Sequence, residues 1–145
     1  MKAKLSRRES REQAFLLAFE RNFNHETVEE LCETAVESRD FEVDDFAIEL
    51  LKQIENNEDE INNLIESNSK GWKIKRISKV ALSILQLAIS ELKYTDVSKI
   101  KAQNPVSVVI NEAVLIAKKY STSEESAFIN GVLGSIVRLE DKNEQ

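Results

Sequence analysis

Apolar residues recur at helical spacing along most of the chain. The i, i+3, i+4, i+7 pattern is clearest over residues 41–56, which predicts an amphipathic helix there. Weaker versions of the pattern predict further helices over 6–23, 26–37, around 61–65, within 74–92, over 105–120 and beyond 122. No stretch alternates apolar and polar residues as a β-strand would. The sequence therefore predicts an all-α protein, a bundle of about seven helices.

The helix within residues 74–92 differs from the others because it is apolar on nearly all sides. Between Val80 and Ile89 only Ser83 and Gln86 are polar. A helix without a polar face belongs at the centre of a bundle. A chain of 145 residues is long enough to bury one hydrophobic core, and no low-complexity linker divides it. We therefore expect a single domain over residues 1–145.

Local signals mark several helix ends. Gly71 is expected to end the helix that contains Ile61 and Ile65, since glycine is common just beyond a helix C-terminus. Asn104 before Pro105 predicts an N-cap followed by proline at the first helical position. The segment 122–125 (TSEE) fits a capping box, which predicts the start of the last helix.

Charge is unevenly distributed along an acidic chain. The formal net charge is −6, yet residues 1–11 hold five basic side chains and one acid. These five residues, here called the basic arm, are Lys2, Lys4, Arg7, Arg8 and Arg11. Between residues 70 and 101 there are eight further Lys or Arg against two acids. An acidic protein could therefore present basic surface to a polyanion, if the fold brings the two basic regions together.

The arginines of the basic arm suit contacts with nucleic acid. A guanidinium group donates paired hydrogen bonds to phosphate oxygens and stacks on bases. Arg7 and Arg11 are one helical turn apart, so they share a helix face. The same residues could also serve only as a solubilising terminus, and the residues alone leave both interpretations open. Phe128 could stack on an unpaired base or belong to the core, and Trp72 could line an interaction surface or pack against the bundle.

Residues for catalysis or metal binding are scarce. His25 is the only histidine and lies in a polar segment between predicted helices, where a surface or capping role is expected. Cys32 falls on an apolar helix face, where a free cysteine serves as a small core residue. No metal-binding or nucleotide-binding motif occurs, and no apolar run is long enough to span a membrane. The sequence therefore predicts a cytoplasmic protein that is not an enzyme.

Four segments form a recognisable series along the chain. They are residues 7–12 (RRESRE) followed by Ala14, Phe15 and Phe19, then residues 85–92 (LQLAISEL), 105–119 (PVSVVINEAVLIAKK) and 128–133 (FINGVL). In this order, and over essentially the whole chain, they resemble the NusB family of bacterial transcription antitermination factors. The last two motifs are the specific ones, because an arginine run alone is a weak signal.

The resemblance implies a fold and a function. The fold would have two helical subdomains, about residues 1–70 with the basic arm and about residues 71–140, without a cofactor or metal. The function would be RNA binding in transcription antitermination. The protein would bind the boxA element of nascent, single-stranded ribosomal RNA together with NusE, a small-subunit ribosomal protein, in the RNA polymerase antitermination complex. A homodimer is possible, and no membrane is involved.

The resemblance also implies roles for particular residues. The residues expected at the RNA are Lys2, Lys4, Arg7, Arg8, Arg11, Glu124 and Phe128. The residues expected to face NusE are Phe19, Lys79 and Ala81. The sequence departs from the family at Ala81–Leu82, which replaces a commonly charged pair, at Gln86 and Ser90, which replace Arg and Tyr, and in a longer loop over 95–104. An alternative hypothesis is a helical protein–protein scaffold or homodimer in which the basic arm is incidental.

Overall fold

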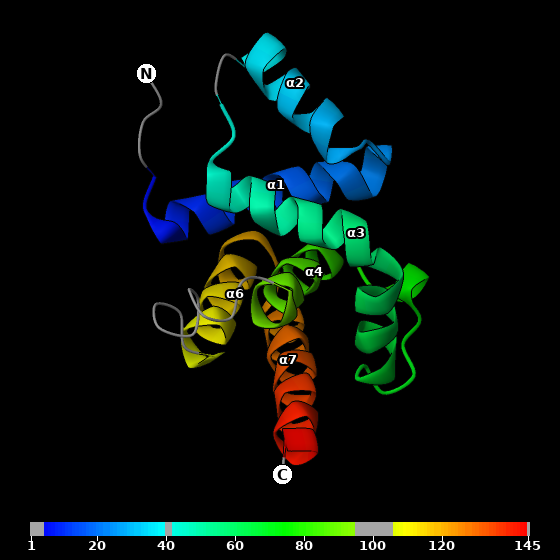
Figure 1. Cartoon of the computed structure of the whole chain (residues 1–145). Coiled ribbons are helices and arrows are strands. Elements are labelled where there is room, and N and C mark those ends of the chain that lie inside the picture. Colours follow the sequence, from blue (N-terminus) through cyan, green and yellow to red (C-terminus); the bar gives the residue numbers. More distant parts are fainter. Residues whose placement is uncertain (1–4, 40–41, 95–105, 145) are drawn as a thin grey trace.

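Helices make up nearly all of the chain that the computed structural model describes, which is residues 5–39, 42–94 and 106–144 (Figure 1). In order, the elements are α1 (Arg7–Asn24), α2 (Val28–Arg39), α3 (Asp45–Ser67), the short 3-10 turn η1 (Ile74–Arg76), α4 (Lys79–Lys93), α6 (Val106–Tyr120) and α7 (Ser123–Glu144). No strand occurs in these ranges. The predicted all-α class is confirmed, and the described residues form six α-helices where about seven were expected.

The missing helix is explained by a kink in α3. The two helices predicted over 41–56 and around 61–65 form one element that bends at Asn57, whose backbone is non-helical (φ −126°, ψ 22°). The side-chain amide of Asn57 donates to the carbonyl of Gln53 at 2.9 Å, which provides a partner for an acceptor next to the break. After the kink the chain turns down beside α4 and α7 (Figure 1).

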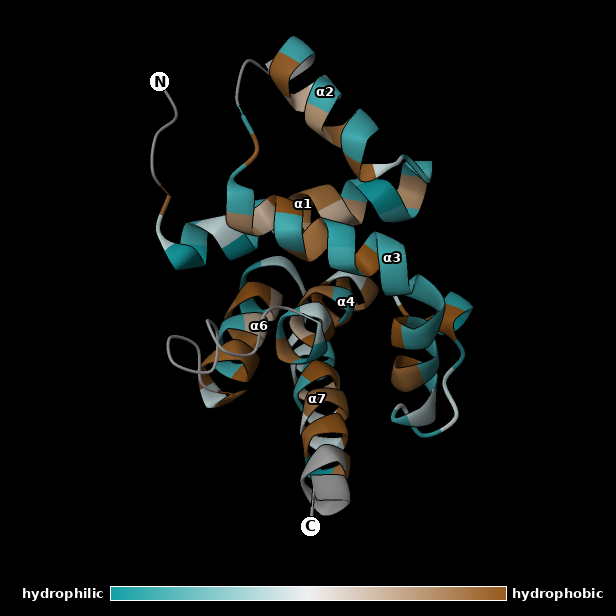
Figure 2. Ribbon diagram, viewed as in Figure 1, coloured by the Kyte–Doolittle hydropathy of each residue, from teal (hydrophilic) through white to brown (hydrophobic). Residues whose placement is uncertain are grey.

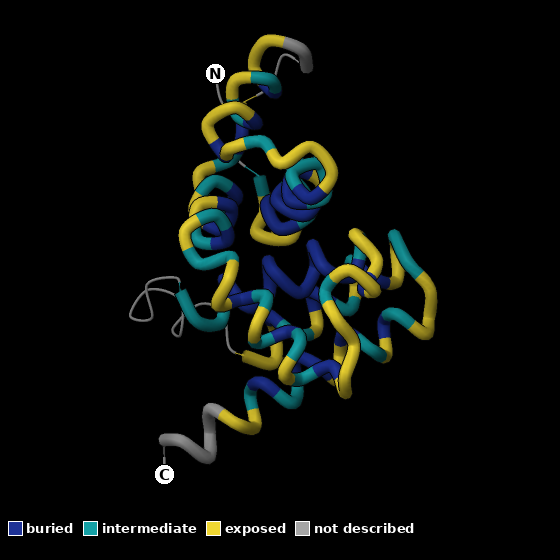
Figure 3. Tube along the Cα trace, turned by 90° about the vertical axis from the view of Figure 1, so that its right-hand side faces the viewer, coloured by how far each residue is buried: buried dark blue, intermediate teal, exposed yellow. Residues whose placement is uncertain are grey.

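Two layers of helices meet over a buried central helix. In Figure 1, α1, α2 and the first half of α3 lie above α4, and α6 and α7 lie below and beside it. Residues 81–91 of α4 are all buried, which confirms the predicted central helix. Buried segments run through the middle of the molecule, where the two layers meet (Figure 3). By contrast, the first turns of α1 are hydrophilic (Figure 2). Because these charged residues favour contact with water, this end of α1 lies at the surface.

Helix caps fix the starts of the elements that carry the candidate site. A capping box begins α1: the backbone N–H of Ser6 donates to Glu9, and the N–H of Glu9 donates to the Ser6 hydroxyl at 3.1 Å. At the start of α7, the Thr122 hydroxyl accepts from the N–H of Glu125 at 3.1 Å, so the predicted cap is confirmed. The predicted cap at Asn104–Pro105 lies outside the described residues.

One continuous hydrophobic core joins all six helices. The exposed His25 ends α1 in the left-handed conformation (φ 56°), and its N–H donates to the carbonyl of Arg21 at 2.8 Å, so its predicted capping role is confirmed. Cys32 is partly buried against the core. In the part of the chain that the structure describes, no helix is long and apolar enough to cross a membrane. The expected division into subdomains near residue 70 stays a prediction.

Candidate functional site

The first part of the candidate site is the start of α1. Arg7 and Arg8 are exposed there, while Lys2 and Lys4 lie outside the described residues. The guanidinium of Arg7 lies over the ring of Phe46, 3.8 Å from its centroid. A cation–π contact uses the flat face of the guanidinium and not its N–H edge, so Arg7 keeps donors available to a ligand.

Arg8 is held by a carboxylate from the other layer. Its Nε lies 3.1 Å from Glu112 Oε2, and its Nη2 lies 2.9 Å from Glu112 Oε1. The Arg8 side chain is 69% exposed and that of Glu112 only 10%. The hydrogen bond to Glu112, followed by its negative charge, raises the pKa of Arg8. Glu112 therefore fixes one edge of the guanidinium and leaves the other edge facing solvent.

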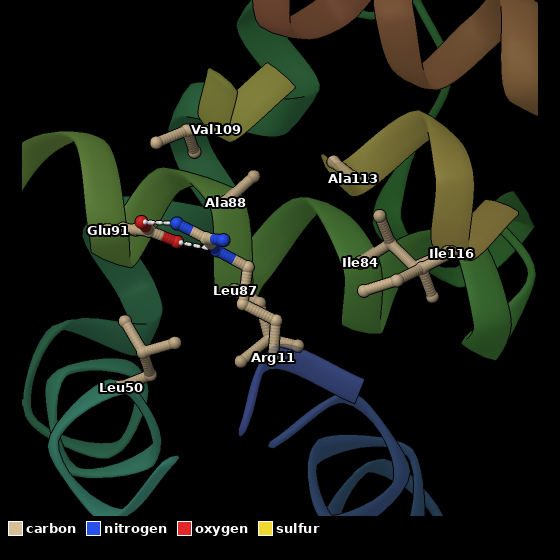
Figure 4. A pocket seen from close by; sticks show the side chains of 9 residues that line it. All are labelled: Arg11, Leu50, Ile84, Leu87, Ala88, Glu91, Val109, Ala113 and Ile116. Carbon is tan, nitrogen blue, oxygen red and sulfur yellow. Dashed lines mark hydrogen bonds and ion pairs between the residues drawn. The ribbon is translucent and has the colours of Figure 1, made fainter. Parts of the chain in front are cut away.

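Arg11 lies inside the protein (Figure 4). Its Nε is 2.9 Å from Glu91 Oε1 and its Nη2 is 2.6 Å from Glu91 Oε2, and the two side chains are only 8% and 3% exposed. A cavity of about 20 Å³ lies beside this pair, lined otherwise by apolar side chains such as Ile84 and Val109. Arg11, which was expected at the RNA, is therefore buried and joins α1 to α4, so the face that it shares with Arg7 is exposed only at Arg7.

The second part of the candidate site is a groove between η1, the start of α4 and the start of α7. It has a volume of about 290 Å³. Its lining residues are Trp72, Arg76, Ile77, Ser78, Ala81, Glu124, Glu125 and Phe128. The rings of Trp72 and Phe128 meet edge to face, with centroids 6.4 Å apart. The structure thus brings Glu124 and Phe128 together, as expected, and adds Trp72 and Arg76 to them.

The two basic regions lie at opposite ends of α4, so the fold does not bring them into direct contact. Arg11 pairs near the C-terminus of α4, whereas η1 precedes its N-terminus. Figure 1 shows the start of α1 (blue) and η1 (bright green) on opposite sides of the molecule. At 1.5 Å per residue, the 15 residues of α4 span roughly 22 Å.

The corner between α6 and α7 connects the two parts. Lys119, near the end of α6, donates to Glu12 of α1 at 2.5 Å, and the hydroxyl of Tyr120 donates to the same oxygen. These bonds, that of Lys119 first, lower the pKa of Glu12, and the bond to Glu12 raises the pKa values of Lys119 and Tyr120. Glu12 follows Arg8 by one helical turn, and α7 begins three residues after Tyr120. Exposed Lys119 therefore ties the end of α6, just before α7, to the helix that carries the arm.

The residues expected to face NusE lie in different surroundings. Phe19 is partly buried, and its ring centroid is 4.9 Å from that of Phe23. Lys79 is exposed as the first residue of α4, but Ala81 is only 1% exposed, at the floor of the groove. Ala81 can therefore shape this surface but offers a partner almost no area of its own.

The departures from the family pattern within α4 are also buried. Leu82, Gln86 and Ser90 are all inside the core. The side-chain amide of Asn22 on α1 donates to Ser83 Oγ at 2.8 Å and to Gln86 Oε1 at 2.9 Å. Gln86 therefore takes part in the contact between α1 and α4, and all three positions lie away from the protein surface. The longer loop over 95–104 lies outside the described residues.

Sequence reasoning missed three parts of this site. Glu91 and Glu112 were not assigned as partners of the arginines, although each is an acid within an apolar helix, and such acids are buried when a cation pairs with them. Arg76 was counted only as one charge of a basic run. Among the described residues, no group of three His, Cys, Asp or Glu side chains could hold a metal ion.

The fold and the two surfaces together define an all-helical protein that presents localised basic and aromatic surface on an acidic body. A sequence model of the NusB family matches residues 8–138. The chain belongs to the NusB family.

Individual relatives agree with this assignment over most of their length. The transcription antitermination protein NusB of Acetivibrio thermocellus is 40% identical over 137 residues, which cover 93% of this chain and 90% of that protein. The protein of the same name from Clostridium botulinum (strain Loch Maree) is 41% identical over 147 residues, which cover 92% of this chain and 100% of that protein.

Solved structures share the fold. The structure of T. maritima NusB matches with a TM-score of 0.77 at 29% identity, covering 99% of this chain and 100% of that one. A chain in the crystal structure of antitermination factors NusB and NusE in complex with dsRNA matches with a TM-score of 0.76 at 26% identity, covering 92% of this chain and 96% of that one.

Proposed function

We propose that this protein is an RNA-binding transcription antitermination factor that acts together with NusE. The RNA ligand would be a boxA-type element of nascent ribosomal RNA, within the RNA polymerase antitermination complex. Both the family and the structural neighbour that contains NusB, NusE and dsRNA support this proposal. Acting with these partners, the protein would work in the bacterial cytoplasm. The role is that of a binding protein and not of an enzyme.

The observation that carries the proposal is that the α6–α7 corner links the two parts of the candidate site. Arg7 and Arg8 lie at the first part, Lys119 bonds the corner to α1, and α7 leads from the corner to Phe128 in the groove. Single-stranded RNA is held by cations along its backbone and by aromatic side chains at its bases. Because the Lys119–Glu12 bond ties the corner to α1, we infer that an RNA strand runs from the arm past this corner to the groove.

The roles of the arm follow from its geometry. Arg7 would bind phosphate through its N–H edge, and Arg8 through the edge that Glu112 leaves exposed. Arg11 would act indirectly, by fixing α1 on α4. Lys2 and Lys4 would add sequence-independent attraction. NusE would bind around Phe19 and Lys79, next to the groove that holds Ala81.

RNA binding titrated against salt tests this function. We expect a boxA oligoribonucleotide to bind more tightly than a scrambled one, and NusE to increase that ratio. The slope of log affinity against log salt counts phosphate contacts, at about 0.7 per contact for a single strand. Arg7→Gln should lower both affinity and slope, whereas the matched control Lys52→Gln, which removes an exposed charge from α3, should change neither. Equal, salt-insensitive binding of both RNAs would refute the proposal.

A scaffold or homodimer in which the arm is incidental is the alternative. Sedimentation with and without RNA separates the two. The scaffold hypothesis would be favoured if the protein forms a dimer whether or not RNA is present, and if it binds neither the boxA nor the scrambled oligoribonucleotide. Because the structural neighbour contains dsRNA, the titration should include the boxA strand annealed to its complement.

A further inference from the structure

Trp72 is exposed on a backbone that is firmly held. Its carbonyl accepts a hydrogen bond from the Ser69 hydroxyl at 2.8 Å, and the turn before it uses left-handed conformations at Lys70 (φ 53°) and Gly71 (φ 89°). Just after it, the N–H of Ile74 donates to Glu66 at 2.9 Å. Yet Trp72 is 52% exposed. A large apolar ring held in place but left at the surface is available to a ligand.

The surroundings of Trp72 are strongly basic. Residues 70–79 contain no acid, and their five cations are all exposed: Lys70, Lys73, Lys75, Arg76 and Lys79. The chain as a whole carries −6, so this concentration of positive charge is local. A basic surface next to an aromatic platform is the combination with which proteins bind single-stranded nucleic acid.

The opposite wall of the groove is acidic, and this narrows the choice of ligand. Glu124 and Glu125 line it at the start of α7. Glu125 accepts a hydrogen bond from the Ser121 hydroxyl, whereas Glu124 is exposed. Carboxylates repel phosphate but accept hydrogen bonds from exocyclic amino groups such as N4 of cytosine or N6 of adenine. The groove therefore suits a base that carries an amino group, with phosphate outside it on the basic side.

We propose that the groove binds one unpaired, amino-bearing nucleobase of a single-stranded RNA. The base stacks on the indole of Trp72 beside Phe128, its amino group donates to Glu124, and Arg76 contacts the adjoining phosphate. We call these four residues the Trp72 slot. The proposal rests on the RNA-binding function proposed above and adds two contact residues and a base preference to it.

The single tryptophan of the chain makes the slot directly observable. A base stacked on Trp72 quenches its fluorescence, while the anisotropy of a 5′-labelled oligonucleotide reports total binding. Short oligoadenylate and oligocytidylate should quench the fluorescence with the same concentration dependence as the anisotropy. Oligouridylate and an oligomer of abasic ribose phosphates should bind through the cations and quench far less.

Variants then assign the contact. Trp72→Ala should weaken oligoadenylate binding by roughly 5- to 150-fold, the range for one base–aromatic stack. Glu124→Gln should reduce the preference of adenine over uracil and leave oligouridylate binding at its former level or higher. Phe23→Ala is the matched control, because Phe23 is an equally exposed aromatic residue on α1, and it should have no effect.

The outcomes separate the slot from the proposed function. Oligoadenylate that binds by anisotropy without quenching Trp72 would overturn the slot and leave RNA binding intact. No binding of any RNA would overturn both. Quenching by NusE alone, with exclusion of oligoadenylate, would assign the groove to the protein partner and overturn the slot. The quenching measurement uses the unmodified protein, so it stands even if Trp72→Ala does not fold.

Discussion

Replacing Arg11 with alanine tests whether this arginine binds RNA or holds the fold together. Its guanidinium and the Glu91 carboxylate are 8% and 3% exposed, and two hydrogen bonds of 2.9 and 2.6 Å join them. Arg11→Ala removes both bonds and enlarges the cavity of about 20 Å³ beside the pair. Removing one partner of a buried ion pair costs about 3–5 kcal/mol of stability, because the other charge stays in the protein interior without the charge that compensated it.

That loss is large for a protein of this size. Domains unfold with about 5–15 kcal/mol, so the variant would lose about a fifth or more of its stability. At roughly 2–4 °C per kcal/mol, the unfolding temperature should fall by roughly 6–20 °C. Thermal and urea unfolding followed by circular dichroism measure both quantities.

The double variant Arg11→Met with Glu91→Leu is the matched control. Removing both charges avoids the buried carboxylate, so most of the lost stability should return. Because Arg11 lies away from the surface, the double variant should also bind RNA as tightly as the parent protein. If Arg11→Ala unfolds at the same temperature and urea concentration as the parent protein, the Arg11–Glu91 pair does not hold α1 on α4. If the folded double variant loses RNA affinity, Arg11 contacts RNA after all.

Three further predictions concern other contacts. The hydrogen bonds from Lys119 and then Tyr120 lower the pKa of Glu12, so the stability that Glu12 contributes is lost as the pH falls below 4.5 through the lowered pKa of the folded protein. The bond to Glu12 raises the pKa of Tyr120, so the stability that Tyr120 contributes is lost as the pH rises above 10.0 through its raised pKa. Glu12→Gln should flatten both limbs when urea unfolding is repeated across pH, and unchanged limbs would contradict this. Asp44→Ala removes the cap that accepts from two N–H groups at the start of α3 and should cost about 0.5–2 kcal/mol in urea unfolding. Asn22→Ala removes the amide that donates to Ser83 and Gln86 on α4, and it should lower the free energy of unfolding by at least about 1 kcal/mol. A smaller decrease would show that these two hydrogen bonds contribute little to stability.

The helices could be predicted from the sequence because each depends on local spacing and caps. The amphipathic pattern places α3 and α7, and the nearly unbroken apolar run places α4 at the centre. The kink at Asn57 could not be predicted in the same way. The pattern breaks at residues 56–60, and a break in periodicity looks the same whether the chain forms a loop or continues as a bent helix.

The site was only partly predictable, because its decisive contacts join residues far apart in the sequence. Arg8 and Glu112 are 104 positions apart, and Arg11 and Glu91 are 80 apart. Composition shows the three arginines as one basic cluster. Only the fold shows which carboxylates pair with these arginines, and therefore which arginine remains available to a ligand.

The helical positions of the three arginines explain why we expect the arm alone to bind RNA weakly. Arg7 and Arg11 share a face of α1, and both guanidinium groups lie near the ring of Phe46, at 3.8 and 5.9 Å from its centroid. Arg11 is one turn further along, where α4 covers the helix, so the same face that is exposed at Arg7 is buried at Arg11. Arg8 points to α6, where Glu112 offsets its charge. Two of the three charges thus pair with carboxylates of α4 and α6, so we expect tight RNA binding to depend also on the cations and rings around the groove.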